Sequence, residues 1–323
     1  MIYLVSGCAG FIGFNVVKKL LTNSDKVIGI DNLNNYYDID LKKSRLNILL
    51  KNQNFKFIKC DLIEKNRLAK IFNKYKFKSV INLAAQAGVR YSLEKPEEYV
   101  KSNLVGFFNL LELTKTHKIK NFIYASSSSV YGDQGGNKFS ESDTSANNPE
   151  QFYAATKRSN EIIAKSYSNL YGINTVGIRY FTVYGPYGRP DMSIFKFTKN
   201  ILENKKIEVF NFGKHKRDFT YVEDAAELTV RIIKKLNSNK KRISEIFNIS
   251  RGSSIPLMKI IKLIEKNLSI NAKIKYLPKQ KGDVVSTFGN NEKVIKYTNF
   301  SKFVKPEDGI SRFVNWYLEY FNQ

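Results

Sequence analysis

Short apolar runs alternate with amphipathic stretches of helical length through the first half of the chain. The apolar runs are rich in Val, Ile and Phe, which favour buried strands, and they cover residues 2–5, 26–30, 55–59, 79–83, 121–125 and 175–178. The stretches between them predict helices at about 11–21, 41–50, 65–72, 97–116 and 152–170. Repeated strand–helix crossovers predict an α/β fold with a doubly wound parallel sheet, whose ligands bind at the carboxyl ends of the strands.

The pattern changes after about residue 185, where turn signals, short helices and short strands replace the regular alternation. Residues 220–226 predict one more strand and the start of a helix that belong to the first unit. We therefore expect an α/β domain of residues 1–185 that also receives about 219–250. The smaller mixed α/β C-terminal domain is expected within 186–323, mainly as segments 186–218 and 251–323, closing over the strand edge to form a substrate cleft.

A glycine-rich turn follows the first apolar run. Gly7, Gly10 and Gly13 stand three residues apart, between a strand and a helix. Gly7 permits a tight turn, Gly10 lets a pyrophosphate approach the backbone, and Gly13 lets the helix pack on the strand. Asp31 ends the second strand, where a carboxylate bonds the ribose hydroxyls of NAD and repels the extra phosphate of NADP. The turn and Asp31 together predict a Rossmann-type unit that binds NAD.

The strand at 121–125 leads into a run of serines, and a tyrosine and a lysine follow on the next predicted helix. Tyr153 and Lys157 are four residues apart, so they lie on one helix face. There the ammonium can stabilise a phenolate and lower the tyrosine pKa, while a serine of 126–129 holds the substrate oxygen. Tyr91 and Lys95 share this spacing, but the proline that follows predicts a helix end or a loop. The first pair therefore predicts oxidation of a sugar or alcohol carbon with a nicotinamide.

Composition limits the function classes without choosing one. With 323 residues, 42% of them hydrophobic, the chain can bury a large core. The net charge of +24 and the pI near 9.7 suggest nucleic-acid binding. However, the lysines are spread over nearly every predicted helix, and the densest group, Lys234-Lys235 with Lys240-Lys241-Arg242, straddles a predicted helix end, where cations suit the helix dipole. We expect no specific nucleic-acid site, although the positive field would favour anionic substrates.

The few cysteines and histidines indicate the compartment and argue against a metal. Cys8 and Cys60 are too few for a disulfide framework, which favours a reducing cytoplasm. These cysteines, His117 and His215 show no metal-site spacing, so we expect no metal. The strand expected at residue 2 leaves no room for a signal peptide, and no apolar run is long enough to span a bilayer.

These features together resemble the extended short-chain dehydrogenase/reductase family of nucleotide-sugar enzymes, and the resemblance covers nearly the whole chain. Within that family the chain is most similar to UDP-glucuronate 4-epimerases. The glycine turn and the Tyr/Lys pair are common to the superfamily, whereas Ala87–Arg90 and Arg189–Met192 narrow the resemblance. The stretches that carry it are residues 31–38, 83–92, 102–106, 181–186, 188–198 and 217–222.

The resemblance implies a mechanism. The Tyr153 phenolate, tuned by Lys157 and the nicotinamide charge, removes the proton of the sugar 4-hydroxyl while hydride leaves carbon 4 for NAD. Ser127 orients that hydroxyl. The 4-keto intermediate then swings about its diphosphate link and receives the hydride on its other face. NAD is regenerated and is expected to stay bound, and the UDP-sugar product would serve polysaccharide biosynthesis.

The resemblance also assigns binding residues, in part supported by their positions at strand ends. Asp61 would meet the adenine amino group, residues 84–86 would let the cofactor approach (or simply form a tight strand–helix junction), and Arg217 would grip the diphosphate. The expected cofactor site comprises Gly7, Gly10, Phe11, Ile12, Gly13, Asp31, Asn32, Asp61, Leu62, Leu83, Ala84, Ala85, Gln86, Asn103, Ser126, Tyr153, Lys157, Tyr180 and Val183. The expected substrate site comprises Arg90, Ser127, Ser128, Thr182, Arg189, Val209, Phe210, Arg217, Gln280 and Asp283. Residues 279–283 also fit a lysine-rich surface turn.

Neighbouring activities of the family differ at the serine run. The dehydratases carry Asp-Glu directly after the catalytic hydroxyl residue, and the uronate decarboxylases keep the Glu, whereas this chain has Ser128 and Ser129. Ser128, Thr182 and Arg189 would instead hold the substrate carboxylate, which raises the barrier to decarboxylation. The alternative for Arg189 is a loop arginine that Asp191 neutralises.

Three departures from the epimerase pattern leave every catalytic group in place: Asn82 for the usual His, Tyr187 at a variable position, and Gly-Asn-Asn at 289–291 for Ala-Asp. The other functions compatible with the sequence are 4-epimerisation of another UDP-hexose or an N-acetylated UDP-sugar, UDP-uronate decarboxylation, and a non-catalytic scaffold that binds RNA. By family analogy we expect a C2 homodimer through the helices that hold Ser102 and Tyr153.

Overall fold

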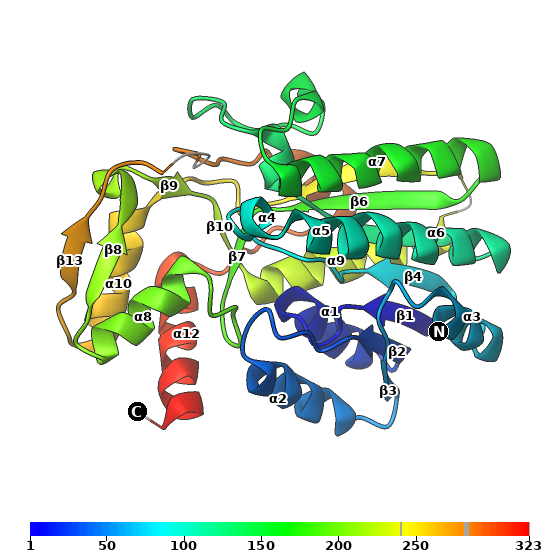
Figure 1. Cartoon of the computed structure of the whole chain (residues 1–323), viewed down its shortest axis with the longest axis horizontal. Helices are drawn as coiled ribbons and strands as arrows, with labels where there is room; N and C mark the ends of the chain where they lie inside the picture. The colour runs from blue at the N-terminus through cyan, green and yellow to red at the C-terminus, as the bar shows by residue number, and fades with distance from the viewer. Residues whose placement is uncertain (240, 281–283, 323) are drawn as a thin grey trace.

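The computed structural model describes residues 1–239, 241–280 and 284–322, so Lys240 of the predicted cation cluster and Asp283 of the predicted substrate site lie outside the described residues. Seven strands in this part of the chain form one sheet in the order β11-β6-β5-β4-β1-β2-β3, and every neighbouring pair is parallel (Figure 1). The strands are β1 (Ile2–Ser6), β2 (Lys26–Asp31), β3 (Phe55–Lys59), β4 (Ser79–Asn82), β5 (Asn121–Ser127), β6 (Asn174–Tyr180) and β11 (Ser244–Ile249). The predicted α/β fold class is confirmed.

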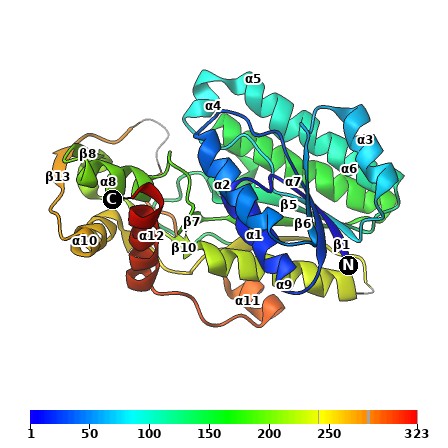
Figure 2. The ribbon, with the colours of Figure 1, turned by 90° about the horizontal axis from the view of Figure 1, so that it is seen from below.

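Helices cover both faces of the sheet because each buries one apolar face against it. Figure 2 shows α1, α9 and α11 below the sheet and α3, α6 and α7 above it, in agreement with two separate clusters of buried side chains. The large-lobe helices are α1 (Phe11–Leu21), α2 (Ile39–Leu50), α3 (Lys65–Lys74), α4 (Tyr91–Glu94), α5 (Pro96–Tyr99), α6 (Gly106–Thr116), α7 (Phe152–Tyr171), α9 (Val222–Ser238) and α11 (Glu292–Thr298). The order of the strands reverses between β1 and β4, which is where such sheets bind dinucleotides.

The sequence prediction of one helix over 97–116 is wrong in its middle. The structure has α5, then a π-helical turn η1 (Val100–Val105), then α6. A π-helical turn inserts one extra residue per turn, which hydrophobic periodicity over so short a stretch does not reveal. The pair Tyr91 and Lys95 behaves as expected, because α4 ends at Glu94.

A second group of elements, hereafter the small lobe, lies beside the carboxyl edge of the sheet (left in Figure 1). Its apolar cluster is formed mainly by α8, α10, α12 and the parallel pair β8–β13. The remaining elements are α8 (Ser193–Leu202), α10 (Leu257–Leu268), α12 (Pro306–Phe321), β7 (Thr182–Tyr184), β8 (Lys206–Val209), β9 (Lys216–Arg217), β10 (Phe219–Tyr221), β12 (Ile255–Pro256), β13 (Lys273–Tyr276), η2 (Ser128–Tyr131), η3 (Thr144–Asn147) and η4 (Phe210–Gly213). The strand and helix predicted for 220–226 are confirmed as β10 and the start of α9.

The described residues contain neither a membrane-spanning helix nor a metal-binding cluster. None of their helices combines the length and the apolar character needed to cross a bilayer. No cluster of three or more His, Cys, Asp or Glu side chains within 1–239, 241–280 and 284–322 is arranged to hold a metal ion. Cys8 and Cys60 are both buried free thiols.

Candidate active site

A cavity of about 1160 Å³ runs along the carboxyl edge of the sheet and between the two lobes. It brings together predicted residues that are far apart in the sequence. Those that line it are Gly7, Gly10, Phe11, Ile12, Gly13, Asp31, Asn32, Asp61, Leu62, Leu83, Ala84, Ala85, Gln86, Arg90, Ser126, Ser127, Ser128, Tyr153, Lys157, Tyr180, Thr182, Val183, Arg189, Phe210, Arg217 and Gln280. The cavity therefore holds most of the predicted cofactor and substrate sites in one continuous space.

The glycine turn forms a cradle for an anion. Gly7 has φ +71°, and a Cβ there would lie 2.6 Å from the Ala84 nitrogen, while a Cβ on Gly13 would collide with the Gly7 carbonyl. A Cβ on Gly10 would meet only Gly7 atoms within 4 Å, so this face of the turn is left to the cavity. The N-terminus of α1 has no side-chain cap and no acidic residue in its first turn. Its N–H groups and the positive end of its dipole therefore fit the pyrophosphate of NAD.

Two carboxylates occupy the ends of β2 and β3 beside this turn. The Asp31 carboxylate accepts hydrogen bonds from the backbone N–H groups of Ala9 (3.1 Å) and Leu33 (2.9 Å). Burial raises the pKa of Asp31, and these N–H groups and the nearby cations oppose the rise. Asn32 donates to Asp61 at 2.7 Å. Both carboxylates line the cavity beside the glycine turn, and their roles toward the adenosine ribose and the base stay predictions.

The predicted catalytic side chains come from β5 and from the first two turns of α7. The Lys157 ammonium donates to the Ala125 carbonyl at 2.9 Å and lies 5.9 Å from the centre of the Tyr153 ring. Ser127, the last residue of β5, bonds both the N–H and the hydroxyl of Ser129, at 3.1 and 3.0 Å. All three predicted catalytic residues line the cavity, and each carries a group that can hold or move a proton at a sugar hydroxyl.

The expected lowering of the Tyr153 pKa is not found in the protein alone. Burial raises the pKa of Tyr153, and the charge of Arg189 and a hydrogen bond from Ser127 only partly oppose this. Burial also lowers the pKa of Lys157 to about 8, although Glu161 acts to raise it. Desolvation thus outweighs the effect of the paired residues on both groups, and the positive nicotinamide of NAD is the further charge that would favour the phenolate.

The buried ammonium of Lys157 predicts a specific pH dependence of stability. The folded pKa of about 8 lies below 10.5, the ordinary value for a lysine, so the unfolded chain holds more protons between these pH values. The cost of the buried charge, ~3 kcal/mol, is therefore complete below pH 8 and disappears towards pH 10.5. We expect Lys157→Met to gain stability relative to wild type at pH 7 and to lose that advantage by pH 10.5, in urea unfolding of NAD-stripped protein. A difference between the two proteins that is constant with pH would contradict this.

Two predicted contact residues do not line the cavity. Asn103, in the π-helical turn, accepts from the Gln86 N–H (2.8 Å) and donates to the Gln86 carbonyl and the Thr156 hydroxyl (both 3.1 Å). It therefore fixes the loop after β4 to α7 and acts on the cofactor site through Gln86. Val209 is fully buried in the small-lobe core, because β8 alternates inward and outward, and its neighbour Phe210 faces the cavity instead.

The substrate end of the cavity is rich in cations and aromatic rings. Arg189 forms a bidentate ion pair with Asp191 through Nε (3.0 Å) and Nη2. In the protein without ligands, Asp191 therefore neutralises the charge of Arg189, which is the alternative that the sequence left open. The remaining nitrogen, Nη1, takes no part in this pair. The guanidinium of Arg90 lies 5.1 Å from the Phe210 ring centre, and the buried Oε1 of Gln280 has no partner in the described part of the chain. These groups suit an anionic sugar, a base and a ribose.

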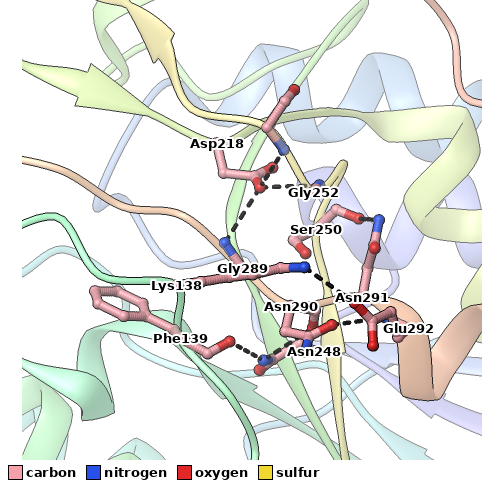
Figure 3. Close-up of polar contacts among 11 residues, drawn as sticks. Lys138, Phe139, Asp218, Asn248, Ser250, Gly252, Gly289, Asn290, Asn291 and Glu292 are labelled. Carbon is pink, nitrogen blue, oxygen red and sulfur yellow. Dashed lines mark hydrogen bonds and ion pairs between the residues drawn. The ribbon is translucent and has the colours of Figure 1, made fainter.

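The departures at Asn82 and at 289–291 lie in the scaffold. Asn82, in β4, accepts from the Ser6 hydroxyl at 2.5 Å. Figure 3 shows Gly289 and Gly252 donating to the Asp218 carboxylate, at 3.3 and 3.0 Å, and Asn291 bonded to Ser250. Asp218 thereby joins these C-terminal segments to the end of β9, which carries the cavity residue Arg217. None of these described departures lines the cavity, so they leave the predicted contacts unchanged.

Sequence reasoning missed several residues that line the cavity. Tyr36 donates to Asp191 at 3.3 Å, and Lys42 donates to the backbone and side-chain oxygens of Asn34 at 2.6 and 2.7 Å. Burial lowers the pKa of Lys42 to about 8. Lys42 follows Leu41 on the buried face of α2, and a lysine on an apolar face was the available signal.

Comparisons with known proteins agree with this geometry. The model of the NAD dependent epimerase/dehydratase family matches residues 3–250. A UDP-glucuronate 4-epimerase of Thermodesulfobacterium geofontis is 44% identical over 98% of this chain and 96% of its own. The crystal structure of UDP-glucuronic acid 4-epimerase from Bacillus cereus, in complex with UDP-glucuronic acid and NAD, has a TM-score of 0.92 and 33% identity, covering 99% of this chain and all of that one. A UDP-glucose 4-epimerase of Thermotoga maritima, solved with UDP-glucose, has a TM-score of 0.87 and 27% identity, covering 99% of this chain and 100% of that one.

The family match spans most of the chain and includes the glycine turn, the catalytic strand end and α7. The cradle at α1 and the carboxylate of Asp31 fit the dinucleotide that gives the family its name. The chain therefore belongs to the NAD dependent epimerase/dehydratase family, and it is an NAD-dependent enzyme of the extended short-chain dehydrogenase/reductase type.

Proposed function

We propose that this protein interconverts UDP-glucuronate and UDP-galacturonate by epimerisation at carbon 4. One observation carries the proposal: the predicted catalytic residues Ser127, Tyr153 and Lys157 share a cavity with Arg189, which has a guanidinium nitrogen that Asp191 does not use. A sugar whose 4-hydroxyl meets Tyr153 can then present a 5-carboxylate to Arg189. Relatives named UDP-glucuronate 4-epimerase, at 40–44% identity, support the same assignment.

The chain supplies positioning and proton transfer in this reaction. Bound NAD would accept a hydride from carbon 4 and return it to the opposite face. Tyr153 would take the proton of the 4-hydroxyl and later give it back, Ser127 would hold the oxygen, and Lys157 would stabilise the phenolate. The 4-keto sugar would turn about its diphosphate, which Arg217 anchors at the far end of the cavity.

The uracil and its ribose would occupy the small-lobe end of the cavity. Phe210 offers a ring face already covered on one side by Arg90, and such a stack suits a flat base. The buried Gln280 oxygen needs a donor, which a ribose hydroxyl provides. A firm grip on the nucleotide leaves the sugar free to rotate, which epimerisation requires.

Retention of the carboxylate distinguishes this reaction from decarboxylation. The two residues after Ser127 are serines, so the serine run carries no carboxyl group. Ser129 is hydrogen-bonded to Ser127. Ser128 and Thr182 line the same cavity as Arg189, and their hydroxyls can donate to the substrate carboxylate. Hydrogen bonds and positive charge favour the ionised carboxylate, whose charge is lost on decarboxylation, and so raise that barrier.

One observation favours a second candidate, 4-epimerisation of a neutral UDP-hexose. Asp191 already neutralises Arg189, and a neutral pair would tolerate a hydroxymethyl group at carbon 5. The Tyr36 hydroxyl donates to Oδ2 of Asp191, the oxygen that also accepts from Nη2 of Arg189. The choice between the two substrates therefore depends on how strongly the unused nitrogen of Arg189 binds a carboxylate in this site.

The test is proton NMR of purified protein with UDP-glucuronate and no added cofactor, run beside UDP-glucose and UDP-N-acetylglucosamine. We expect UDP-galacturonate to appear, without carbon dioxide or free NADH. A UDP-pentose would contradict carboxylate retention, and turnover of UDP-glucose alone would assign the second candidate. No turnover of any sugar after NAD is added would refute a 4-epimerase.

We also propose a C2 homodimer through α6 and α7 with η1. Exposed apolar side chains gather on these elements: Val105 is 44%, Phe108 42% and Ile162 57% exposed. Such a face on helices that share an edge of the molecule suits a four-helix contact. We expect a dimer mass in light scattering, and Phe108→Lys with Ile162→Lys should give monomers. A monomeric wild type would refute the dimer.

The two-domain division and the compartment are also our inferences. The separate apolar cluster of α8, α10, α12 and β8 supports a small substrate domain, although α11 packs with the sheet domain. Buried free thiols at Cys8 and Cys60 are compatible with a reducing cytoplasm. Limited proteolysis that releases no fragment of either size would argue against the division, and secretion of the native protein would refute the compartment.

A further inference from the structure

Arg45, in the middle of α2, is a fully buried arginine whose hydrogen bonds all go to neutral oxygens. It is 0% exposed, and no carboxylate of the described residues forms an ion pair with it. A buried guanidinium is costly unless its N–H groups are hydrogen-bonded. Each of its three nitrogens donates, so the surroundings of Arg45 are built to receive it.

The acceptors of Arg45 belong to segments that are far apart in the sequence. Nη1 donates to the Ala9 carbonyl at 2.8 Å, inside the glycine turn, and to the Tyr37 hydroxyl at 2.7 Å. Nη2 and Nε donate to the Tyr187 carbonyl at 2.7 and 3.2 Å, and Nη2 also reaches the Gly188 carbonyl at 3.4 Å. One side chain therefore ties the pyrophosphate turn to the loop that precedes Arg189.

A second connection runs beside the first. Tyr36, next to Tyr37 in the chain, donates to Asp191, and Asp191 holds Arg189 through both carboxylate oxygens. The segment after β2 thus holds loop 187–191 at both ends, through Arg45 of α2 at Tyr187 and through Tyr36 of the connecting loop at Asp191. The planar fork of Arg45 serves the first end and a tyrosine hydroxyl serves the other.

Loop 187–191 needs this support. Tyr187 adopts a left-handed backbone conformation, with φ +60°, which is strained for a residue with a side chain. Its ring is wedged between Phe14 of α1 (5.3 Å between ring centres) and Trp316 of α12 (4.9 Å). A strained segment persists only when its surroundings hold it, and Arg45 binds the carbonyl of that residue twice.

We propose that Arg45 is a positioning residue that couples loop 187–191, which carries Arg189, to the glycine turn. The loop presents Arg189 correctly only while Arg45 bridges Ala9 and Tyr187, so cofactor retention and selectivity for a uronate depend on the same side chain. The proposal rests on the proposed function in one respect, the assignment of the substrate carboxylate to Arg189. Arg45 itself contacts neither ligand, because it does not line the cavity.

The experiment compares Arg45→Lys with wild type, both carrying Tyr153→Phe to prevent turnover. Calorimetry on NAD-loaded protein gives the affinities for UDP-glucuronate, UDP-glucose and UDP, and gel filtration gives the NAD retained. A lysine cannot bridge both carbonyls, so we expect UDP-glucuronate to bind ~10-fold more weakly. UDP should bind within about twofold of wild type, since its contacts lie at the small-lobe end, and less NAD should be retained.

The matched control is Arg231→Lys, which removes a similar clamp elsewhere. Arg231, on α9, donates to the carbonyls of Thr298 and Asn299, at 3.2 and 3.1 Å, away from the cavity. It should lower the melting temperature without changing the ratio of UDP-glucuronate to UDP affinity. Equal weakening of all three ligands in Arg45→Lys, or the same change of ratio in Arg231→Lys, would overturn the proposal.

A second variant, Tyr37→Phe, and the amount of NAD retained distinguish failure of this proposal from failure of the proposed function. If Arg45→Lys does not fold, Tyr37→Phe removes one acceptor without deleting a charge, and it should shift the same ratio in the same direction; an unchanged ratio would overturn the proposal. If wild type binds UDP-glucuronate no better than UDP-glucose, the proposed function fails. NAD retention then decides on Arg45 alone, with retention equal to wild type as the refuting result.

Discussion

Tyr153→Phe should lower kcat for the proposed epimerisation by about 10³-fold. The reason is that no other described hydroxyl in the cavity lies on α7 beside a lysine. The substitution removes the group that takes and returns the proton, yet it leaves the ring in the packed position it has against Tyr99, 6.0 Å between ring centres. The Kd for UDP-glucuronate should therefore change little. Coupled assays of UDP-galacturonate and calorimetry measure the two quantities.

The matched control is Tyr167→Phe on the same helix. Tyr167 donates to Glu112 at 2.8 Å and does not line the cavity. This change also removes one tyrosine hydroxyl bond, and it should leave kcat within about twofold of wild type. A Tyr153→Phe enzyme that retains a tenth or more of wild-type kcat would show that another group moves the proton.

Glu161→Leu should destabilise the fold by ~3–5 kcal/mol, the range for breaking a buried ion pair. Glu161 is 2% exposed and accepts from Ser126 (2.6 Å), from Arg179 through two nitrogens (both 2.8 Å) and from Arg158 (2.8 Å). Burial alone would raise the pKa of Glu161, but Arg179 and the other donors bring it below its usual value. Without the carboxylate, Arg179 is left as an unpaired buried charge behind the active site.

Urea unfolding of the single variants and of Glu161→Leu/Arg179→Met tests this explanation. The double variant should recover part of the loss, because it removes the stranded charge together with its partner. Glu98→Gln, which removes an exposed carboxylate paired with Lys101 alone, should cost at most about 1 kcal/mol. A double variant as unstable as the two single losses added together would mean that packing, not charge, explains the effect.

Local patterns were enough to predict the fold and to select the proposed catalytic residues that the fold brings to one cavity. The glycine spacing, the aspartate at the end of β2 and the Tyr153–Lys157 pair each act over a few residues, and parallel strands bring their carboxyl ends to one edge. Periodicity placed six of the seven strands of the described sheet to within a residue or two at their ends but did not predict β11, and the order of elements then determined which loops meet.

What the sequence could not predict depends on long-range contacts. Arg45 lies between Leu41 and Leu49 on the buried face of α2, and an arginine among leucines on such a face indicates a buried guanidinium. Only the fold brings its acceptors at Ala9 and Tyr187 to it. The same holds for Asn103, which appeared to be a contact residue and instead braces Gln86.

The sequence by itself determined that this protein is a parallel α/β enzyme that uses NAD, and it predicted a Ser/Tyr/Lys catalytic set at one strand edge, because these features depend on short-range spacing. Only the tertiary structure decided the ionisation of that set and the partners of Arg189. Burial raises the pKa of Tyr153 and lowers that of Lys157, and Asp191 occupies two nitrogens of the arginine. Desolvation and charge pairing depend on which surfaces meet after folding, and no local pattern encodes that.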